Sequence, residues 1–172
     1  MRTSRQPVRS LDRLDRRILA LLQADGRMSM KDLAEAVGLT ITPCIERVKR
    51  LERDGVIMGY HARLNPVLLG SALLVFVEIT LRDKSGNMFE QFRREVLRIP
   101  EVLECHLVSG DFDYLIKARI REIGEYRRLL GDILLQLPGA AQSKSYVVME
   151  EIKETLAISV EEKAPAAGAG RN

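Results

Sequence analysis

Residues 29–53, SMKDLAEAVGLTITPCIERVKRLER, contain two segments of helical periodicity separated by only three residues, Gly38 to Thr40. The first segment begins at Ser29, a good helix N-cap, with Asp32 at the reciprocal capping position. It stops at Gly38, the residue type that favours the left-handed conformation of a helix C-cap. Two short helices joined by such a turn are typical of a helix-turn-helix.

The second of these helices opens at Thr40 or Thr42, and either choice places Pro43 in the first turn, where its missing N–H costs no hydrogen bond. Apolar residues at i, i+4 and i+7 predict a narrow buried stripe: Cys44, Val48 and Leu51. The other faces are polar and basic, which suits a recognition helix in the major groove of DNA.

Candidate DNA-binding residues follow from that surface. The side chains able to read base edges are Thr42, Glu46, Arg47 and Arg50, beside Pro43 in the first turn. The side chains suited to phosphates are Thr40, Lys49 and Arg53, with Arg2, Arg5 and Arg9 of the N-terminus. The alternative is an ordinary solvated face of a small helical bundle, which spacing alone leaves open.

A further helix precedes this pair. Asp12 can cap it, Asp15 stands three residues on as an acidic capping partner, and Gly26 ends it. After the recognition helix, residues 56–64 alternate in polarity and predict a hinge with one or two short strands, in the manner of a winged-type helix-turn-helix.

Basic charge is concentrated in the first third of the chain. Lys and Arg minus Asp and Glu give 12 − 8 = +4 over residues 1–60 and 15 − 16 = −1 over residues 61–172, which add to the net charge of +3. A local positive surplus favours a polyanionic partner, although many solvated surfaces carry as much.

Targeting and redox signals are simple. No apolar run is long enough to span a bilayer, and no apolar stretch follows the N-terminal arginines as a secretory signal requires, so we expect a cytoplasmic protein with no membrane partner. Cys44 and Cys105 lie far apart and outside any C-x-x-C pair, so we expect reduced thiols and no metal site.

The pattern changes once, near residues 65–66, from helical periodicity to alternating strands and helices. We therefore expect a flexible basic arm (1–10), a helix-turn-helix domain (11–59), a hinge (60–70), an α+β domain (71–153) and a tail disordered at its end (154–172).

The α+β domain follows the order β-α-β-β-α-β. Strands are predicted at 71–81, 102–108, 113–120 and 143–152, and helices at 87–98 and 123–137. This order predicts a four-stranded antiparallel sheet with both helices on one face, the ferredoxin-like arrangement. The fold class is thus α+β: a winged-type helix-turn-helix domain followed by a ferredoxin-like domain.

One face of that sheet is left without a cover. Its apolar candidates are Leu74, Phe76, Val108 and Leu115, or the alternate residues of the same strands if the register is shifted by one. An uncovered apolar face predicts burial against a second subunit, and a homodimer would present two recognition helices to a pseudo-palindromic DNA site.

A tight turn at residues 107–114, LVSGDFDY, carries the most suggestive polar groups of the domain. Asp113 can accept the ammonium of an amino acid, and backbone groups beside Gly110 can donate to its carboxylate. The competing interpretation is an ordinary Gly-Asp turn in which Asp bonds its own backbone. His106 projects from the opposite sheet face to Cys105, so no Cys-His pair forms, and we expect no enzyme.

Five stretches between about Leu11 and Lys153 match the pattern of one known family: LDRLDRRIL (11–19), TPCIERVKRLER (42–53), LVFVEI (74–79), ECHLVSGDFDY (104–114) and YVVMEE (146–151). In these stretches the chain resembles the Lrp/AsnC, or feast/famine, regulators.

The resemblance implies that the α+β domain is the effector-binding and oligomerisation unit called the RAM domain in this family. It implies dimers that assemble further, to octamers for example, on double-stranded DNA, in a nucleoid-associated protein that needs no cofactor and takes a small amino acid, leucine, as effector. The positions that match the family's leucine-response residues are Leu107, Asp113, Ile123, Tyr146, Val147 and Val148.

Two functions remain in competition at this point. The first is a sequence-specific regulator, activator or repressor, of amino-acid metabolism genes, in which leucine or a similar amino acid binds between RAM domains and shifts the assembly state. The second is an architectural DNA-wrapping protein with little effector response, which would bind with weak sequence preference and steep salt dependence.

Overall fold

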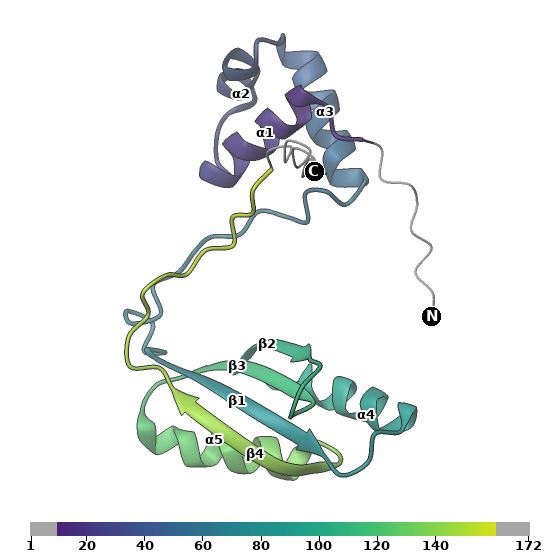
Figure 1. The fold of residues 1–172 in the computed structure, drawn as a ribbon. Coiled ribbons are helices and arrows are strands. Elements are labelled where there is room, and N and C mark those ends of the chain that lie inside the picture. The colour runs from purple at the N-terminus through teal and green to yellow at the C-terminus, as the bar shows by residue number, and fades with distance from the viewer. Residues whose placement is uncertain (1–9, 161–172) are drawn as a thin grey trace, which may run out of the picture. The chain divides into compact units, whose positions relative to one another are not determined.

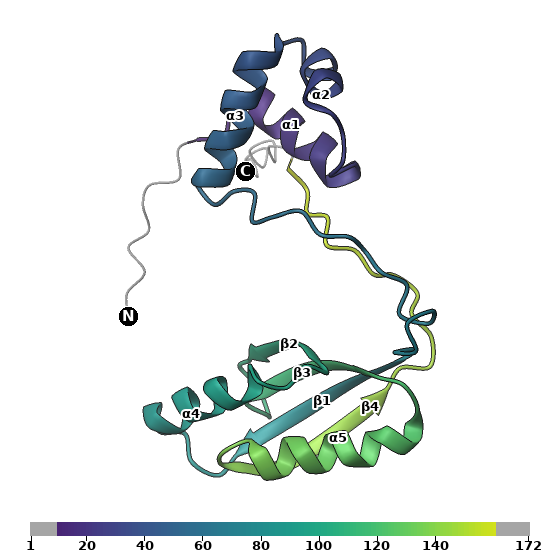
Figure 2. The same ribbon diagram turned by 180° about the vertical axis from the view of Figure 1, so that it is seen from behind.

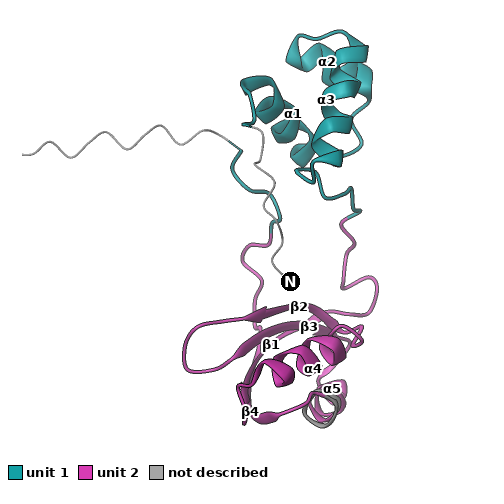
Figure 3. Ribbon diagram, turned by 90° about the vertical axis from the view of Figure 1, so that its right-hand side faces the viewer, with its two compact units in different colours: residues 1–62, 155–172 teal, residues 63–154 magenta. Residues whose placement is uncertain are grey.

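The computed structural model describes residues 10–160, apart from the side chains of residues 132–136. The chain divides into two compact units (Figure 3). The helical unit comprises the described residues up to Ala62 together with those from Thr155 onward, and the sheet unit runs from Arg63 to Glu154. Residues 1–9 of the predicted arm and 161–172 of the predicted tail lie outside the described residues.

The helical unit contains the three expected helices, α1 (Arg13–Ala24), α2 (Met30–Val37) and α3 (Ile41–Arg53) (Figure 1). The capping box predicted for α1 is present, because Asp12 Oδ1 accepts from the Asp15 N–H at 2.8 Å and Asp15 Oδ2 accepts from the Asp12 N–H at 3.2 Å. Ser29 caps α2 as expected, but Asp32 accepts from the Ser29 hydroxyl at 2.7 Å and not from its backbone N–H. The short Ser hydroxyl reaches Asp32 directly.

The core of the helical unit is formed by one apolar stripe from each helix. Its buried side chains include Ile18 and Leu22 of α1, Leu33 and Val37 of α2, and Cys44, Val48 and Leu51 of α3. The stripe predicted for α3 is therefore confirmed. Burial raises the pKa of the Cys44 thiol, so this cysteine packs as a small hydrophobic residue.

The short strands expected over residues 56–64 are not formed. Val56 and Ile57 donate to the Leu51 carbonyl and close the end of α3, and residues 58–64 belong to no strand of the described chain. A strand needs a neighbouring backbone to accept and donate its hydrogen bonds, and polarity alternation alone does not supply one.

The sheet unit follows the predicted order, with β1 (Leu73–Leu81), α4 (Gly86–Val96), β2 (Val102–Leu107), β3 (Tyr114–Ile120), α5 (Ile123–Gln136) and β4 (Ala140–Val147). Its four strands are antiparallel in the order β2-β3-β1-β4, and both helices cover the same face (Figure 2). The ferredoxin-like prediction is confirmed. No helix among the described residues is long and apolar enough to cross a membrane.

The last strand differs from the prediction of 143–152. It begins earlier, at Ala140, because Gly139 turns the chain with a φ of 74° and its carbonyl accepts from the Arg82 N–H at the end of β1. It ends earlier, at Val147, although the Val148 N–H still bonds the Leu74 carbonyl. Met149 and Ile152, which extend the apolar pattern, are 95% and 89% exposed.

The two sheet faces are chemically different. Val75, Val77, Ile79, Ile116 and Ala118 point toward α4 and α5 and form the core with Phe92, which stacks on Tyr114. The open face carries Leu74, Phe76 and Leu115 as predicted, but these lie among charged side chains, and the predicted Val108 follows the end of β2 and belongs to no strand. The expectation of an apolar open face is thus wrong in part, because Glu78, Lys117 and Arg119 share it.

Candidate functional site

The turn between α2 and α3 sets the direction of the exposed helix. Gly38 has a φ of 73°, a backbone conformation that residues other than glycine adopt only at an energetic cost. Its N–H donates to the carbonyls of Ala34 and Glu35. The next residue but one, Thr40, is the N-cap of α3, and its hydroxyl makes no capping hydrogen bond. The first N–H groups of α3 therefore receive no side-chain cap from Thr40, and such a helix start is a favourable place for a phosphate.

A groove of about 470 Å³ borders this helix start, lined by Lys31, Ala34, Glu35, Leu39, Thr40, Ile41 and Thr42. Ile41 is 48% exposed at the first position of α3. Pro43 follows in the first turn, as predicted, and is exposed.

The outer stripe of α3 consists of Thr42, Glu46, Lys49 and Arg53. These residues follow one another at i, i+4, i+7 and i+11, all four are exposed, and they lie opposite the buried stripe of Cys44, Val48 and Leu51. Among the described residues, Lys49 takes part in no ion pair, and Arg53 has only its neighbour Asp54 at 3.9 Å. The stripe can therefore reach a groove of DNA without breaking an ion pair to another helix.

Arg47 and Arg50 are arranged differently from the rest of the predicted set. Arg47 Nη1 lies 2.6 Å from Asp12 Oδ2 and 2.8 Å from Asp15 Oδ1, and Arg50 Nη2 pairs with the same Asp15 oxygen. The Asp12 and Asp15 carboxylates raise the pKa of Arg47, and the hydrogen bonds from the Asp15 N–H and Arg47 lower the pKa of Asp12. Both arginines therefore fasten α3 to α1. The predicted phosphate contacts Arg2, Arg5 and Arg9 lie outside the described residues.

The predicted effector residues fall into two groups in the sheet unit. The turn group lies at the turn from β2 to β3 and consists of Leu107, the last residue of β2, with Gly110 and Asp113 of the turn itself. Leu107 is 60% exposed, whereas Asp113 is buried. Asp113 Oδ2 accepts from the Leu81 N–H at 2.8 Å, and its own N–H donates to the Ile79 carbonyl.

Asp113 also has a cation beside it. Lys84 Nζ lies 2.9 Å from Asp113 Oδ1. Burial on its own would raise the pKa of Asp113, but the Leu81 N–H and the Lys84 ammonium outweigh that effect and lower it. The carboxylate thus stays charged, joins the end of β1 to the start of β3, and already holds one ammonium group.

The edge group consists of Ile123, Tyr146, Val147 and Val148. Ile123 opens α5 and is 63% exposed. Tyr146 donates its hydroxyl hydrogen to Glu78 Oε1 at 2.9 Å on the open face, and the Lys144 ammonium lies 5.1 Å from the centre of its ring. A pocket of about 560 Å³ near the start of α5 is lined by Ser71, Pro100, Glu101, Leu103, Arg119, Ile120, Arg121, Glu125 and Arg128.

The two groups lie at opposite ends of the sheet. Leu107 pairs with Tyr114 at the start of β3, whereas Val147 pairs with Val75, which lies opposite Ala118 near the end of β3. Four residue steps along β3, about 14 Å, and the three strand spacings from β2 to β4, about 14 Å, together separate the two groups by about 20 Å. One chain cannot place both groups around one small amino acid.

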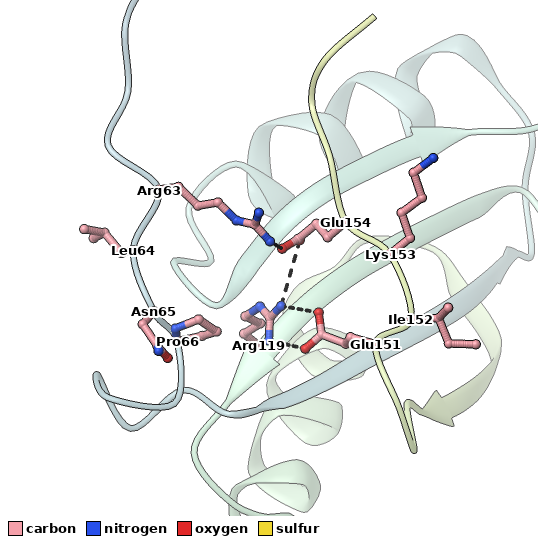
Figure 4. A pocket seen from close by; sticks show the side chains of 9 residues that line it. All are labelled: Arg63, Leu64, Asn65, Pro66, Arg119, Glu151, Ile152, Lys153 and Glu154. Atoms are coloured by element: carbon pink, nitrogen blue, oxygen red, sulfur yellow. Dashed lines mark hydrogen bonds and ion pairs between the residues drawn. The ribbon is translucent and has the colours of Figure 1, made fainter. Parts of the chain in front are cut away.

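Sequence reasoning missed a charged cluster on the open face. Arg119 donates to both carboxylate oxygens of Glu151, at 3.0 and 2.6 Å, and Lys117 donates to Glu154 and Glu104 at 3.0 and 3.1 Å. Figure 4 shows Arg119, Glu151, Arg63 and Glu154 facing one another across a pocket of about 510 Å³. The signal was available, because two basic residues at i and i+2 of a strand share a face and need partners.

Comparison with known proteins assigns both units. Residues 11–58 match the family model described as "Winged helix-turn-helix DNA-binding", and residues 74–158 match the "Lrp/AsnC ligand binding domain". The leucine-responsive regulatory protein of Escherichia coli is 54% identical over 153 residues, which cover 89% of this chain and 93% of the relative.

Two solved structures share the fold at lower identity. A transcriptional regulator of Neisseria meningitidis in complex with L-methionine has a TM-score of 0.81 at 34% identity, with 87% of this chain and 96% of that chain covered. A feast or famine regulatory protein of M. tuberculosis complexed with L-methionine has a TM-score of 0.79 at 30% identity, with 87% and 99% covered.

A helix-turn-helix with an exposed polar stripe on its second helix, joined in one chain to a ligand-binding α+β domain, defines a DNA-binding transcription regulator and not an enzyme. The chain belongs to the Lrp/AsnC family. The family resemblance inferred from the sequence is confirmed.

Proposed function

We propose that this protein regulates genes of amino-acid metabolism, as activator or repressor, by binding specific duplex DNA sites in a manner that leucine or a similar amino acid changes. The observation that carries this proposal is the division of the effector residues into a turn group and an edge group that one chain holds about 20 Å apart. A small ligand that contacts both groups must bind between chains, so it couples occupancy to assembly.

On the DNA side, the outer stripe of α3 carries recognition. Thr42 and Glu46 read base edges, and Lys49, Arg53 and Thr40 contact phosphates near the helix start and along its exposed face. Pro43 shapes the first turn. Arg47 and Arg50 act mainly by holding α3 on α1, since Asp12 and Asp15 already occupy their guanidinium groups.

On the effector side, an apolar side chain packs against Leu107 of one chain and Ile123, Tyr146, Val147 and Val148 of another. Leu107 and Ile123 are 60% and 63% exposed in one chain, so both side chains are available to contact a ligand or a second chain. Asp113 takes the ammonium, in competition with Lys84, and N–H groups beside Gly110 take the carboxylate. Methionine, the ligand named for the two solved neighbours, offers the same zwitterion with an apolar side chain of similar size.

The assembly and location of the protein are part of the same proposal. The open sheet face pairs two chains into a dimer, which assembles further, to octamers, on the DNA of the nucleoid in the cytoplasm. In this proposal residues 11–59 are the DNA-binding domain, 60–70 the hinge and 71–153 the RAM domain.

The test is fluorescence anisotropy of the full-length protein on its own upstream DNA and on a scrambled duplex, at one fixed salt concentration, with and without L-leucine. We expect tighter binding to the upstream DNA and an affinity that leucine changes about five-fold or more. Equal binding to both duplexes, unchanged by L-leucine and by L-methionine, would contradict the proposal and point to an architectural DNA-wrapping protein.

A further inference from the structure

The segment Thr155–Val160 belongs to the helical unit, although it follows the sheet unit in the chain. It lies along α1 and is held there by side chains that contact its backbone. The key pair joins Gln23 and Ile158, which are 135 residues apart in the sequence. The tail therefore returns to the unit that carries the recognition helix.

Gln23 binds one residue of the segment at two points. Its Nε2 donates to the Ile158 carbonyl at 2.9 Å, and its Oε1 accepts from the Ile158 N–H at 2.8 Å. A primary amide used in this way replaces the neighbouring strand that an extended peptide would otherwise need. The Gln23 amide contacts only backbone atoms of Ile158, so this contact depends on an extended backbone and not on the type of side chain at position 158.

A second contact lies two helical turns earlier on the same face of α1. Arg16 Nη1 donates to the Val160 carbonyl at 2.9 Å, and the Val160 side chain packs against the core of the helical unit. Since Gln23 and Arg16 are seven residues apart, they share one face of the helix, and the segment runs antiparallel to α1. Arg16 directly follows Asp15, the residue that holds Arg47 and Arg50 of α3.

The other end of the same segment is fastened to the sheet unit. Glu151 and Glu154 pair with Arg119 and Lys117 of β3, a few residues beyond the edge group that ends at Val148. The Lys117 ammonium lowers the pKa of Glu154, so this anchor is charged at neutral pH. Only Thr155, Leu156 and Ala157 separate Glu154 from the first residue bound to α1.

We propose that residues 148–160 form a tether, additional to the hinge, that transmits amino-acid binding at the edge group to α1 and through Asp15 to the recognition helix. This inference rests on the proposed function, since it names the route of its regulation. The four residue steps from Glu154 to Ile158 span at most about 14 Å, so this short linker limits how far the Glu154 anchor can move before it pulls on Ile158.

Two variants of the full-length protein test the tether. Gln23→Ala removes the two-point contact with Ile158, and Gln142→Ala, an exposed glutamine of β4, is its matched control. A chain that ends at Glu154 removes the docked segment, and a chain that ends at Val160 is its control because it keeps every docking contact described. L-leucine binding is measured by calorimetry, and DNA affinity is measured with and without L-leucine.

The tether predicts that Gln23→Ala and the chain ending at Glu154 bind L-leucine like the wild type, while the leucine-induced change in DNA affinity falls from about five-fold or more to below about two-fold. Both controls keep the wild-type ratio. A wild-type ratio in the variants, with L-leucine bound, overturns the proposal.

Hydrogen exchange at the Ile158 amide tests the docking without reference to leucine. Since this N–H donates to Gln23 Oε1, it exchanges about ten-fold or more faster in Gln23→Ala than in the wild type and in Gln142→Ala. If the DNA affinity of the wild type does not respond to leucine, the proposed function fails. The exchange rate of the Ile158 amide then still tests whether the segment docks on α1. Equal exchange in Gln23→Ala and wild type overturns the docking.

Discussion

Arg47 Nη1 of α3 lies 2.8 Å from Oδ1 of Asp15 in α1, and the Asp15 side chain is only 2% exposed. Arg50 pairs with the same oxygen. A buried carboxylate that holds two guanidinium groups fixes the rotation of α3 about its own axis against α1. It therefore fixes which residues of α3 face outward. The polar surface that sequence analysis assigned to DNA contact therefore has two parts, one that faces solvent and one that orients it.

Asp15→Asn tests this orienting role. Removing the charge leaves two partly buried cations without their carboxylate. We expect the helical unit to lose about 2 to 4 kcal/mol of stability. This loss is smaller than for fully buried ion pairs, because about a quarter of each arginine side chain is exposed. Asp12→Asn, at a position with 48% exposure where Asn caps equally well, should cost under about 1 kcal/mol. Hydrogen exchange of the α3 amides measures both, and equal effects would contradict the orienting role.

Lys49 and Arg47 should behave differently on DNA. Lys49→Ala removes a solvent-facing charge, so we expect uniformly weaker binding and a fall of about one in the slope of log affinity against log salt. Arg47→Ala should also weaken binding to all sequences alike, through a changed position of α3, but should leave the salt slope near that of the wild type, because Arg47 is paired with Asp12 and Asp15. Binding isotherms on the upstream DNA and on single-base variants separate the cases: a loss of about 1 to 3 kcal/mol confined to one base would instead make Arg47 a base reader.

The sequence predicted the elements better than the direction of individual side chains. Caps, apolar stripes and turn residues act over three or four positions, so the three helices and the βαββαβ order follow from local pattern. The pairing of Arg47 with Asp15 joins two helices 32 residues apart, and the docking of Ile158 on Gln23 joins positions 135 residues apart. No local period encodes such contacts, and a flexible basic side chain on a helix is as consistent with an internal carboxylate as with a phosphate.

Asp113→Asn should lower stability of the sheet unit in a pH-dependent manner. The folded pKa of Asp113 lies below its ordinary value of 3.8, so its charge contributes stability that is present above that value and is lost as pH falls through the lower, folded pKa. We expect a cost of about 1 to 2 kcal/mol at pH 7 that shrinks below about pH 4. Hydrogen exchange of β3 amides measures it. Asp111→Asn, at an exposed position of the same turn, is the control, and a cost that grows on acidification would refute the assignment.

Lys84→Met distinguishes an effector role of Asp113 from a purely structural one. Lys84 Nζ lies 2.9 Å from Asp113 Oδ1, where the ammonium of an amino acid would bind. If Asp113 receives that ammonium, loss of the competing lysine should tighten L-leucine binding about two- to ten-fold, equivalent to at most about 1.4 kcal/mol. Titration calorimetry checks this, with Lys31→Met, the same substitution at an exposed position of the helical unit, as the control. Unchanged or weaker leucine binding would leave Asp113 as the structural link between β1 and β3.

Gly139 and Gly70 separate two reasons for a glycine in the sheet unit. Both have a positive φ, 74° and 70°, so Ala at either position carries conformational strain of about 1 kcal/mol. A Cβ at Gly139 would also lie 2.6 Å from Met88 Sδ, whereas one at Gly70 would meet nothing within 4 Å.

Gly139 sets the start of β4, and with it the register that places Tyr146 opposite Phe76. We therefore expect Gly139→Ala to cost about 1 to 3 kcal/mol more stability than Gly70→Ala. Thermal unfolding of both variants, and of Gly139→Ala combined with Met88→Ala, measures the difference. If the stability costs of Gly139→Ala and Met88→Ala simply add in the combined variant, the clash with Met88 is not the cause. Backbone strain then accounts for this glycine.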